Sequence, residues 1–221
     1  MSDDSFFREV NEEIRQDRAK ALWDRYGALI IALAVATVLG TAAFVGYEYW
    51  TGTRSSRSGD DFAQALALAN EGKNDEALAA LKALETNGHG AYPVLARMRA
   101  ATVMVEKGDF ADAVAAFDAI SNDNSIPMSI RDMARLRAAF VLVDNGSYAD
   151  VSQRVEQLTA DTNPLRHSAR EALGLSAWKE SKNQDAMKLF EQIAGDEAAP
   201  RDARERAELM IELIRGSGSA S

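Results

Sequence analysis

The hydrophobic pattern of this chain divides it near residue 50. Residues Gly27 to Tyr47 read GALIIALAVATVLGTAAFVGY and include no charged residue. A helix of this length spans roughly 32 Å, about the thickness of the hydrocarbon core of a bilayer. Aromatic residues, which favour membrane interfaces, flank both ends of the run: Trp23, Tyr26, Tyr47, Tyr49 and Trp50. The pattern predicts a single transmembrane helix over residues 27–50.

Two alternatives compete with a membrane span. Buried helices of soluble proteins are usually shorter and rarely have aromatic residues at both ends. A cleaved signal peptide has a short basic start, a shorter apolar core and a small-residue cleavage site. Thr41 to Ala43 resemble a weak cleavage site, but the apolar run continues to Tyr47, and a long segment of mixed charge precedes it. Both alternatives therefore fit the sequence less well.

The distribution of Lys and Arg predicts the orientation of the span. Segments rich in Lys and Arg stay on the cytoplasmic side, and acidic residues count for little in this rule. The basic residues before the run are Arg8, Arg15, Arg18, Lys20 and Arg25, and those soon after it are Arg54 and Arg57. The bias predicts a cytoplasmic N-terminal helix over residues 1–26 and an exported remainder. The N-terminal helix is either a plain extension of the membrane helix or a docking helix.

Small residues recur at every fourth position within the apolar run. They are Ala28, Ala32, Ala36 and Gly40. Such a ridge lets a second membrane helix approach closely. Because alanine is common in membrane helices, the ridge is either a helix-contact site, centred on Ala32, Ala36 and Gly40, or a chance pattern.

Beyond the apolar run, polar and apolar residues alternate with helical periodicity and repeat. Residues 51–59, TGTRSSRSG, are polar and rich in Gly and Ser, and predict a flexible tether. In the predicted domain, residues 60–215, ARMRAATVMVEKGDFADAVAAF from Ala96 matches ARLRAAFVLVDNGSYADVSQRV from Ala134. Weaker units begin at Phe62 and Ala169. Small and large apolar residues at matched positions predict helix pairs that cross closely and fill the groove toward the next pair.

The matched positions define one register for all four units. The small residues of the first helices are Ala65, Ala101, Ala139 and Gly174, and those of the second helices are Ala77, Ala113, Val151 and Ala186. The large residues that follow are Leu81, Phe117, Val155 and Phe190, then Leu84, Ile120, Leu158 and Ile193. The turns between paired helices carry Gly72, Gly108, Gly146 and Ser181.

The repeat length identifies the kind of solenoid. Units recur roughly every 35 to 38 residues, close to the ~34 of tetratricopeptide (TPR) repeats. The pattern departs from that repeat at its early Trp, where Asp61, Arg97, Arg135 and Arg170 stand. We therefore predict an all-α fold: a single transmembrane helix, then a divergent TPR-like α-solenoid of about four helix pairs. A helix over residues 201–215 would cap it, and residues 216–221 would form a disordered tail.

Composition narrows the functional classes. The chain has 25 Lys and Arg against 34 Asp and Glu, a net charge of −9, which argues against a nucleic-acid partner. It has no Cys, and its two histidines, His89 and His167, stand alone, so no metal or cofactor site is expected. No phosphate-binding glycine loop or hydrolase motif occurs. We expect neither an enzyme nor a small-molecule substrate, and an enzyme with an unrecognised site is the alternative.

Four arginines are the candidate partner-binding residues. Arg97, Arg99, Arg135 and Arg137 occupy equivalent places on the first helices of the second and third units. First helices line the concave face of such stacks, where repeated Arg could hold an acidic segment or a peptide carboxylate. Alternatively, they form internal ion pairs with acids such as Asp112, Asp132 and Asp144.

The N-terminal block carries a more specific resemblance. FREVNEEIRQDRAKALWDRYG, the apolar run and GYEYW resemble the YfgM-like family of ancillary subunits of the bacterial Sec translocon. The resemblance implies a single-pass inner-membrane protein with a periplasmic TPR-like domain. It also implies association with Sec translocon subunits and with a periplasmic membrane-anchored chaperone, and no enzyme activity. A scaffold for another envelope machine, such as cell-wall synthesis or division, remains the alternative.

Overall fold

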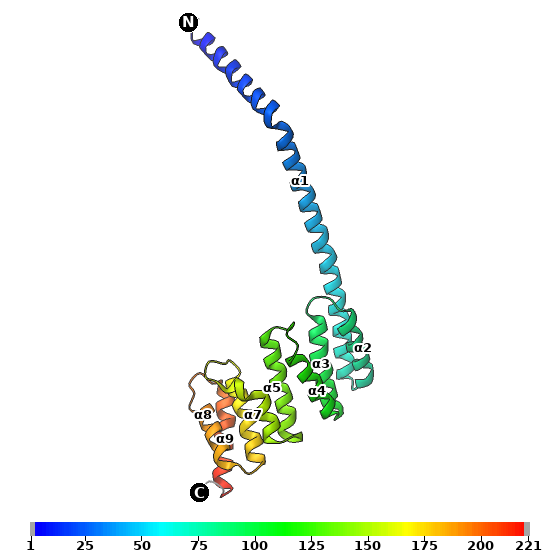
Figure 1. Ribbon diagram of the computed structural model, residues 1–221, viewed down its shortest axis with the longest axis vertical. Coiled ribbons are helices and arrows are strands. Elements are labelled where there is room, and N and C mark those ends of the chain that lie inside the picture. Colours follow the sequence, from blue (N-terminus) through cyan, green and yellow to red (C-terminus); the bar gives the residue numbers. More distant parts are fainter. Residues whose placement is uncertain (1–2, 219–221) are drawn as a thin grey trace. The chain divides into compact units, whose positions relative to one another are not determined.

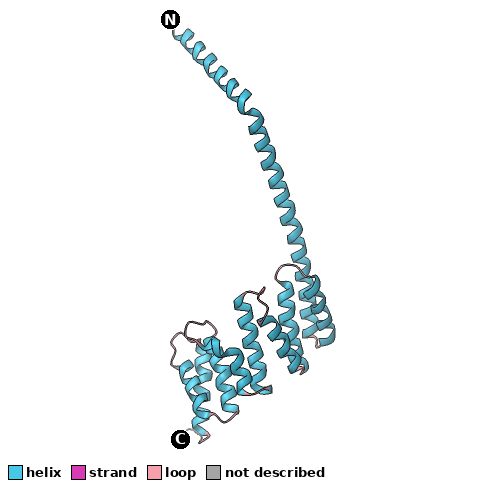
Figure 2. Ribbon diagram, viewed as in Figure 1, coloured by secondary structure: helices cyan, strands magenta, loops and turns pink. Residues whose placement is uncertain are grey.

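The predicted all-α fold is confirmed. The computed structural model describes residues 3–218, which form α-helices, one short 3-10 helix and no strand (Figures 1 and 2). The elements are α1 (Asp3–Asn70), α2 (Asn74–Asn87), α3 (Tyr92–Lys107), α4 (Phe110–Ser121), α5 (Met128–Asn145), α6 (Tyr148–Val155), η1 (Glu156–Thr159), α7 (Arg166–Lys179), α8 (Asn183–Ala194) and α9 (Arg201–Gly216).

The chain forms two compact units, residues 1–56 and 57–221. The first unit is the N-terminal part of α1. Among the described residues, this helix alone is long and apolar enough to cross a membrane, and none of its most apolar part is buried. Its apolar side chains, such as Leu33, Val38 and Phe44, are exposed. Such a surface is suited to lipid rather than to water.

The segment expected to be a flexible tether has a helical backbone. Residues 51–59 lie within α1. Polar side chains in this stretch make local contacts along the helix. The hydroxyls of Thr51 and Thr53 donate to the carbonyls of Tyr47 and Tyr49, four residues earlier, and the Arg54 guanidinium lies 3.9 Å from the centre of the Trp50 ring.

The repeat register is confirmed throughout the second unit. All sixteen small and large positions matched in the sequence are buried. Consecutive helices from α2 to α9 pack against one another, so the stack grows in chain order (Figure 1). The predicted capping helix is α9, which packs on α8 and contributes Ala207, Ile211 and Ile214 to the last core cluster. The predicted tail, 216–221, extends past the described residues, which end at Gly218.

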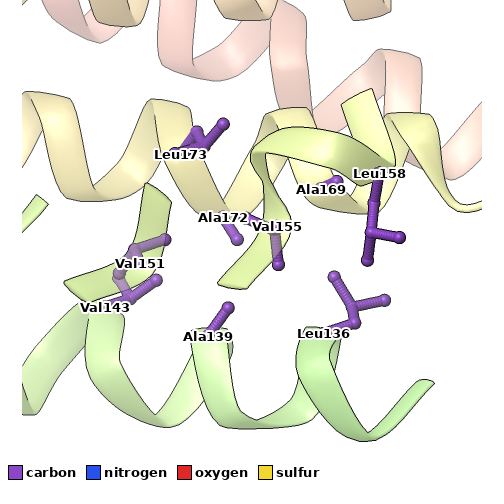
Figure 3. Packing of buried hydrophobic residues seen from close by; sticks show 9 residues of the cluster. All are labelled: Leu136, Ala139, Val143, Val151, Val155, Leu158, Ala169, Ala172 and Leu173. Atoms are coloured by element: carbon purple, nitrogen blue, oxygen red, sulfur yellow. The ribbon is translucent and has the colours of Figure 1, made fainter. Parts of the chain in front are cut away.

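The core consists of successive clusters, each shared by neighbouring helices. Figure 3 shows the third along the chain, which combines Leu136, Ala139 and Val143 of α5 with Ala169, Ala172 and Leu173 of α7 and with Val151, Val155 and Leu158. The small residues bring the helix backbones close, and the larger ones fill the space beside each crossing. At Gly174, a Cβ would lie 2.9 Å from the Phe190 ring, so this crossing requires a glycine.

Three of the four predicted turns adopt the left-handed conformation. Gly72, Gly108 and Ser181 have φ of 75°, 87° and 61°. Gly146 is different, because its backbone is extended and Ser147 begins α6 with a capping box that involves Asp150. The cap lets α6 start immediately, and the short helix continues as η1.

Candidate functional site

The four candidate arginines lie on two equivalent helices. Arg97 and Arg99 belong to α3, and Arg135 and Arg137 belong to α5. Two residues correspond to about 200° around a helix, so the members of each pair point in different directions. The structure accordingly separates them into an inner pair, Arg97 and Arg135, and an outer pair, Arg99 and Arg137.

The inner pair binds acids and helix ends within the stack. Arg97 Nη1 lies 2.8 Å from Asp123 Oδ2, in the loop after α4. Arg135 Nη1 donates to Asp132 Oδ1 at 2.7 Å, and its Nη2 donates to the carbonyl of Ser121, the last residue of α4, at 3.4 Å. Cations at the C-terminal end of a helix satisfy its free carbonyls and interact favourably with its dipole. The inner pair is therefore structural.

A third arginine, at the equivalent place on α7, has the same role. Arg170 is buried and donates to the carbonyl of Thr159, where η1 ends, and to the carboxylate of Asp161. The repeat alignment places Arg170 at the same position as Arg97 and Arg135, but Arg170 was not among the candidate site residues. Arg97, Arg135 and Arg170 thus replace the packing Trp of ordinary repeats with polar contacts to neighbouring helix ends and loops.

These contacts stabilise ionised carboxylates. The Ser125 hydroxyl, Arg97 and the Ser125 amide lower the pKa of Asp123 from 3.8 to about 2. At the other end of the stack, His167 Nε2 lies 2.7 Å from Asp196 Oδ2, and Arg166 pairs with the same carboxylate. His167, the Ala198 amide and Arg166 hold the pKa of Asp196 well below its usual range. His167 therefore has a partner within the stack.

The outer pair lines an open groove between α3 and α5. The groove has a volume of about 440 Å³, in the range of ligand pockets. Its walls are Leu95, Met98, Arg99 and Thr102 of α3, and Ser129, Ile130, Met133 and Arg137 of α5. Most of this lining is apolar, and the two guanidinium groups provide its positive charge.

The guanidinium groups of the outer pair retain free donors. Arg137 is exposed, and the one contact found for it among the described residues is a 3.0 Å hydrogen bond from Nη1 to the Thr102 hydroxyl across the groove. Arg99 Nη1 lies 3.3 Å from Glu106 Oε1, and Arg99 Nε is buried without a hydrogen-bond partner. A guanidinium offers five N–H donors, so both groups can bind a further anion.

The apolar residues of the groove form a second feature, which the arginine pattern alone did not reveal. Leu95 and Met133 are exposed by 42% and 37%, and Phe140, one turn beyond Arg137, by 39%. Leu95 and Met133 are equivalent in the repeat alignment. Extending the alignment to the residues one turn on either side of the arginines would have identified this apolar surface.

The small-residue ridge of the membrane helix has no partner among the residues that the structure describes. Ala32, Ala36 and Gly40 are exposed, and a Cβ placed at Gly40 would meet no other atom within 4 Å. No described residue occupies the ridge, so its role as a helix contact stays a prediction.

Clusters of three or more potential metal ligands do not occur among the residues whose side chains the structure describes, residue 20 and residues 23–218. The groove, with its apolar walls and cationic groups, is suited to binding a protein segment.

Comparison with known proteins supports the fold. A model of the tetratricopeptide repeat-like domain matches residues 20–163, well over half of the chain. The match extends from the apolar span through the third helix pair and includes both groove helices. No curated protein matches the chain. The chain therefore belongs to the tetratricopeptide repeat-like domain family.

Proposed function

We propose that this protein is a membrane-anchored scaffold whose repeat domain binds a protein partner beside the membrane. The observation that carries the proposal is the combination, in one chain, of an apolar membrane-length helix and a TPR-like stack with an open groove. Such stacks present extended surfaces for protein binding. The anchor would restrict the domain to the membrane surface and so raise its effective concentration near membrane-bound partners.

The partner that we propose is the Sec translocon, together with a periplasmic membrane-anchored chaperone. The support is the resemblance of the N-terminal block to the YfgM-like family and the bias of Lys and Arg before the span. In this arrangement the protein is a single-pass protein of the bacterial inner membrane. The N-terminus is cytoplasmic and the repeat domain periplasmic, where it would assist the handling of exported proteins.

Native pull-down of the full chain from detergent extracts tests this proposal. Recovery of channel subunits and the chaperone is the expected result. Recovery of cell-wall or division enzymes instead would assign the scaffold to another envelope machine, the alternative function. An anchor-matched control, in which an unrelated apolar helix replaces residues 27–50, identifies proteins recovered through the anchor alone.

The orientation is tested independently by protease accessibility. Protease added to spheroplasts should digest the repeat domain, whereas intact cells should protect it. Protection in spheroplasts would reverse the proposed topology.

The ridge on the membrane helix provides a third test. Ala36→Leu with Gly40→Leu preserves hydrophobicity but blocks close helix approach. We expect normal membrane insertion and reduced recovery of the channel. Ala34→Leu with Thr41→Leu, on another face, is the matched control. Equal recovery with both double variants would show that the helix only anchors the protein.

A further inference from the structure

Three side chains form a column on one face of α1, where the apolar run ends. Tyr47, Trp50 and Arg54 follow one another at spacings of three and four residues, so they share one face of the helix. The ring centres of Tyr47 and Trp50 are 6.5 Å apart, and the guanidinium carbon of Arg54 lies 3.9 Å from the centre of the Trp50 ring. The column thus changes from aromatic to cationic in the direction away from the apolar run.

The contact with Trp50 determines the depth of this positive charge. The polar interface on each side of a bilayer is roughly 5–7 Å thick. Trp50 is three residues beyond Tyr47, a rise of about 4.5 Å, whereas Arg54 is seven residues beyond it, a rise of about 10.5 Å. Because the guanidinium lies over the Trp50 ring, it is returned to the level of the headgroups, where lipid phosphates lie.

Arg54 has free hydrogen-bond donors at that depth. Its contact with the Trp50 ring is the one interaction found for it among the described residues, and its side chain is exposed. The preceding acid, Glu48, is six residues away and about 120° around the helix. A guanidinium that lies over a ring still directs its N–H groups outward in its own plane, where they can bind a phosphate through two hydrogen bonds.

The surroundings of Arg54 favour a phosphate that belongs to a lipid. The rings of Tyr47 and Trp50 are exposed on the side toward the apolar run, where acyl chains can lie against them. A free phosphate ion has no apolar part that would use this surface. The trimethylammonium group of phosphatidylcholine would be repelled by the guanidinium, whereas the headgroup of phosphatidylglycerol carries no positive charge.

We propose that Arg54, held over Trp50, binds the phosphate of an anionic phospholipid whose acyl chains lie along Trp50 and Tyr47. The inference rests on the proposed function, in which α1 anchors the protein in a membrane. It adds a lipid-binding site at the C-terminal end of the span.

Quenching of Trp50 fluorescence in reconstituted vesicles tests the proposal. The full chain carries Trp23→Phe and Trp178→Phe, which leaves Trp50 as the reporter. The vesicles contain equal amounts of phosphatidylglycerol and phosphatidylcholine, with bromine on the acyl chains of one lipid or of the other. Because bromine quenches tryptophan on contact, the two sets of vesicles report which lipid lies beside Trp50. We expect phosphatidylglycerol to be favoured about fivefold.

Variants in this background assign the preference to Arg54. Arg54→Gln should remove it, and Arg54→Lys should retain part of it, because the charge remains but the planar fork is lost. Arg57→Gln removes the same charge three residues further from the apolar run and is the matched control, which should retain most of the preference. Thermal melts of each variant check that the chain is folded.

A salt comparison distinguishes a lipid phosphate from a free one. Sodium phosphate and sodium chloride at equal ionic strength should lower the preference equally, because each only screens the charges. A larger loss in phosphate would assign Arg54 to the free ion and overturn the proposal.

Three further results would overturn the proposal. Equal quenching by both lipids in a chain that has inserted removes the lipid site and leaves the proposed anchoring intact, whereas failure to insert contradicts both. Equal losses in Arg54→Gln and Arg57→Gln indicate a general attraction of charge to the membrane surface. If the lipids quench equally but Arg54→Gln reduces partner recovery in the native pull-down, Arg54 binds an acid of a protein instead.

Discussion

On α3 the inner and outer arginines differ in their partners rather than in their exposure. The side chains of Arg97 and Arg99 are both 23% exposed. Arg97 nevertheless contacts an acid in the loop after α4, whereas Arg99 contacts Glu106 of its own helix. On α5, Arg135 caps the end of α4, and Arg137 contacts one hydroxyl across the groove. Two residues of sequence thus separate a structural cation from one available to a ligand.

The apolar residues of α5 are likewise divided between those that pack within the stack and those on the groove side. Ala134, Ala138 and Ala139 are fully buried on the faces that pack within the stack, where small side chains permit close crossing. Met133 and Phe140 lie on the groove side and remain partly exposed. On α5, small residues thus permit the close crossings within the stack, whereas Met133 and Phe140 contribute to the open surface.

The largest effect is expected from enlarging a residue on the buried face. Ala139→Leu adds three carbons at a crossing with no exposed surface and should destabilise the fold by about 1–3 kcal/mol. The adjacent substitution Phe140→Leu, on the groove side, is the matched control and should cost less. Thermal melts of the full chain measure both. Equal melting temperatures for the parent and Ala139→Leu would contradict the close crossing.

Removing the inner arginines should have the next largest effect. Arg97→Ala with Arg135→Ala leaves the Ser121 carbonyl and the Asp132 carboxylate without these donors, and Asp132 is only 14% exposed. We expect a loss of about 1–2 kcal/mol, measured by denaturant unfolding. A Lys pair at the same positions should recover part of the loss, because charge is retained but the planar fork is not. If the double variant unfolds like the parent, the inner arginines do not stabilise the stack.

A smaller effect on stability is expected from Asp123, and it should depend on pH. The pKa of Asp123 is lowered from 3.8 to about 2 in the folded chain, so its ionised form stabilises the fold above pH 4. This contribution is lost as the pH falls from about 4 to about 2. Asp123→Asn should therefore be less stable than the parent at pH 7, and the difference should shrink across that window. Melts at closely spaced pH values measure it, and a constant difference would contradict the assigned pairing.

The fold was largely predictable because the repeat register depends on residue size. Ala65, Ala101 and Ala139 are spaced as close crossings require, and that spacing can be read without knowing helix tilts. The turn at Gly146 and the helical backbone of residues 51–59 were not predictable from composition. The turn at Gly146 depends on the hydrogen bonds of the Ser147 capping box, which composition does not specify.

The candidate site was predictable only in part. Periodicity placed the two arginine pairs about 200° apart, but it could not assign their partners, because loop residues such as Asp123 approach α3 only through the fold. The apolar walls were missed for a related reason. Leu95 and Met133 resemble core residues in sequence, and only the space between α3 and α5 leaves them exposed.

The smallest effect on stability is expected from the outer arginines. Arg99→Ala with Arg137→Ala removes a contact to Glu106, which is 40% exposed, and one hydrogen bond to Thr102. Exposed ion pairs contribute little, and both partners regain water when the arginines are removed. We expect the free energy of unfolding to change by less than about 0.5 kcal/mol. Denaturant unfolding of this variant beside the inner double variant measures the contrast directly, since both remove two positive charges from the same helices. If the outer variant loses as much stability as the inner one, all four arginines stabilise the stack. The outer pair would then not be available to bind a ligand.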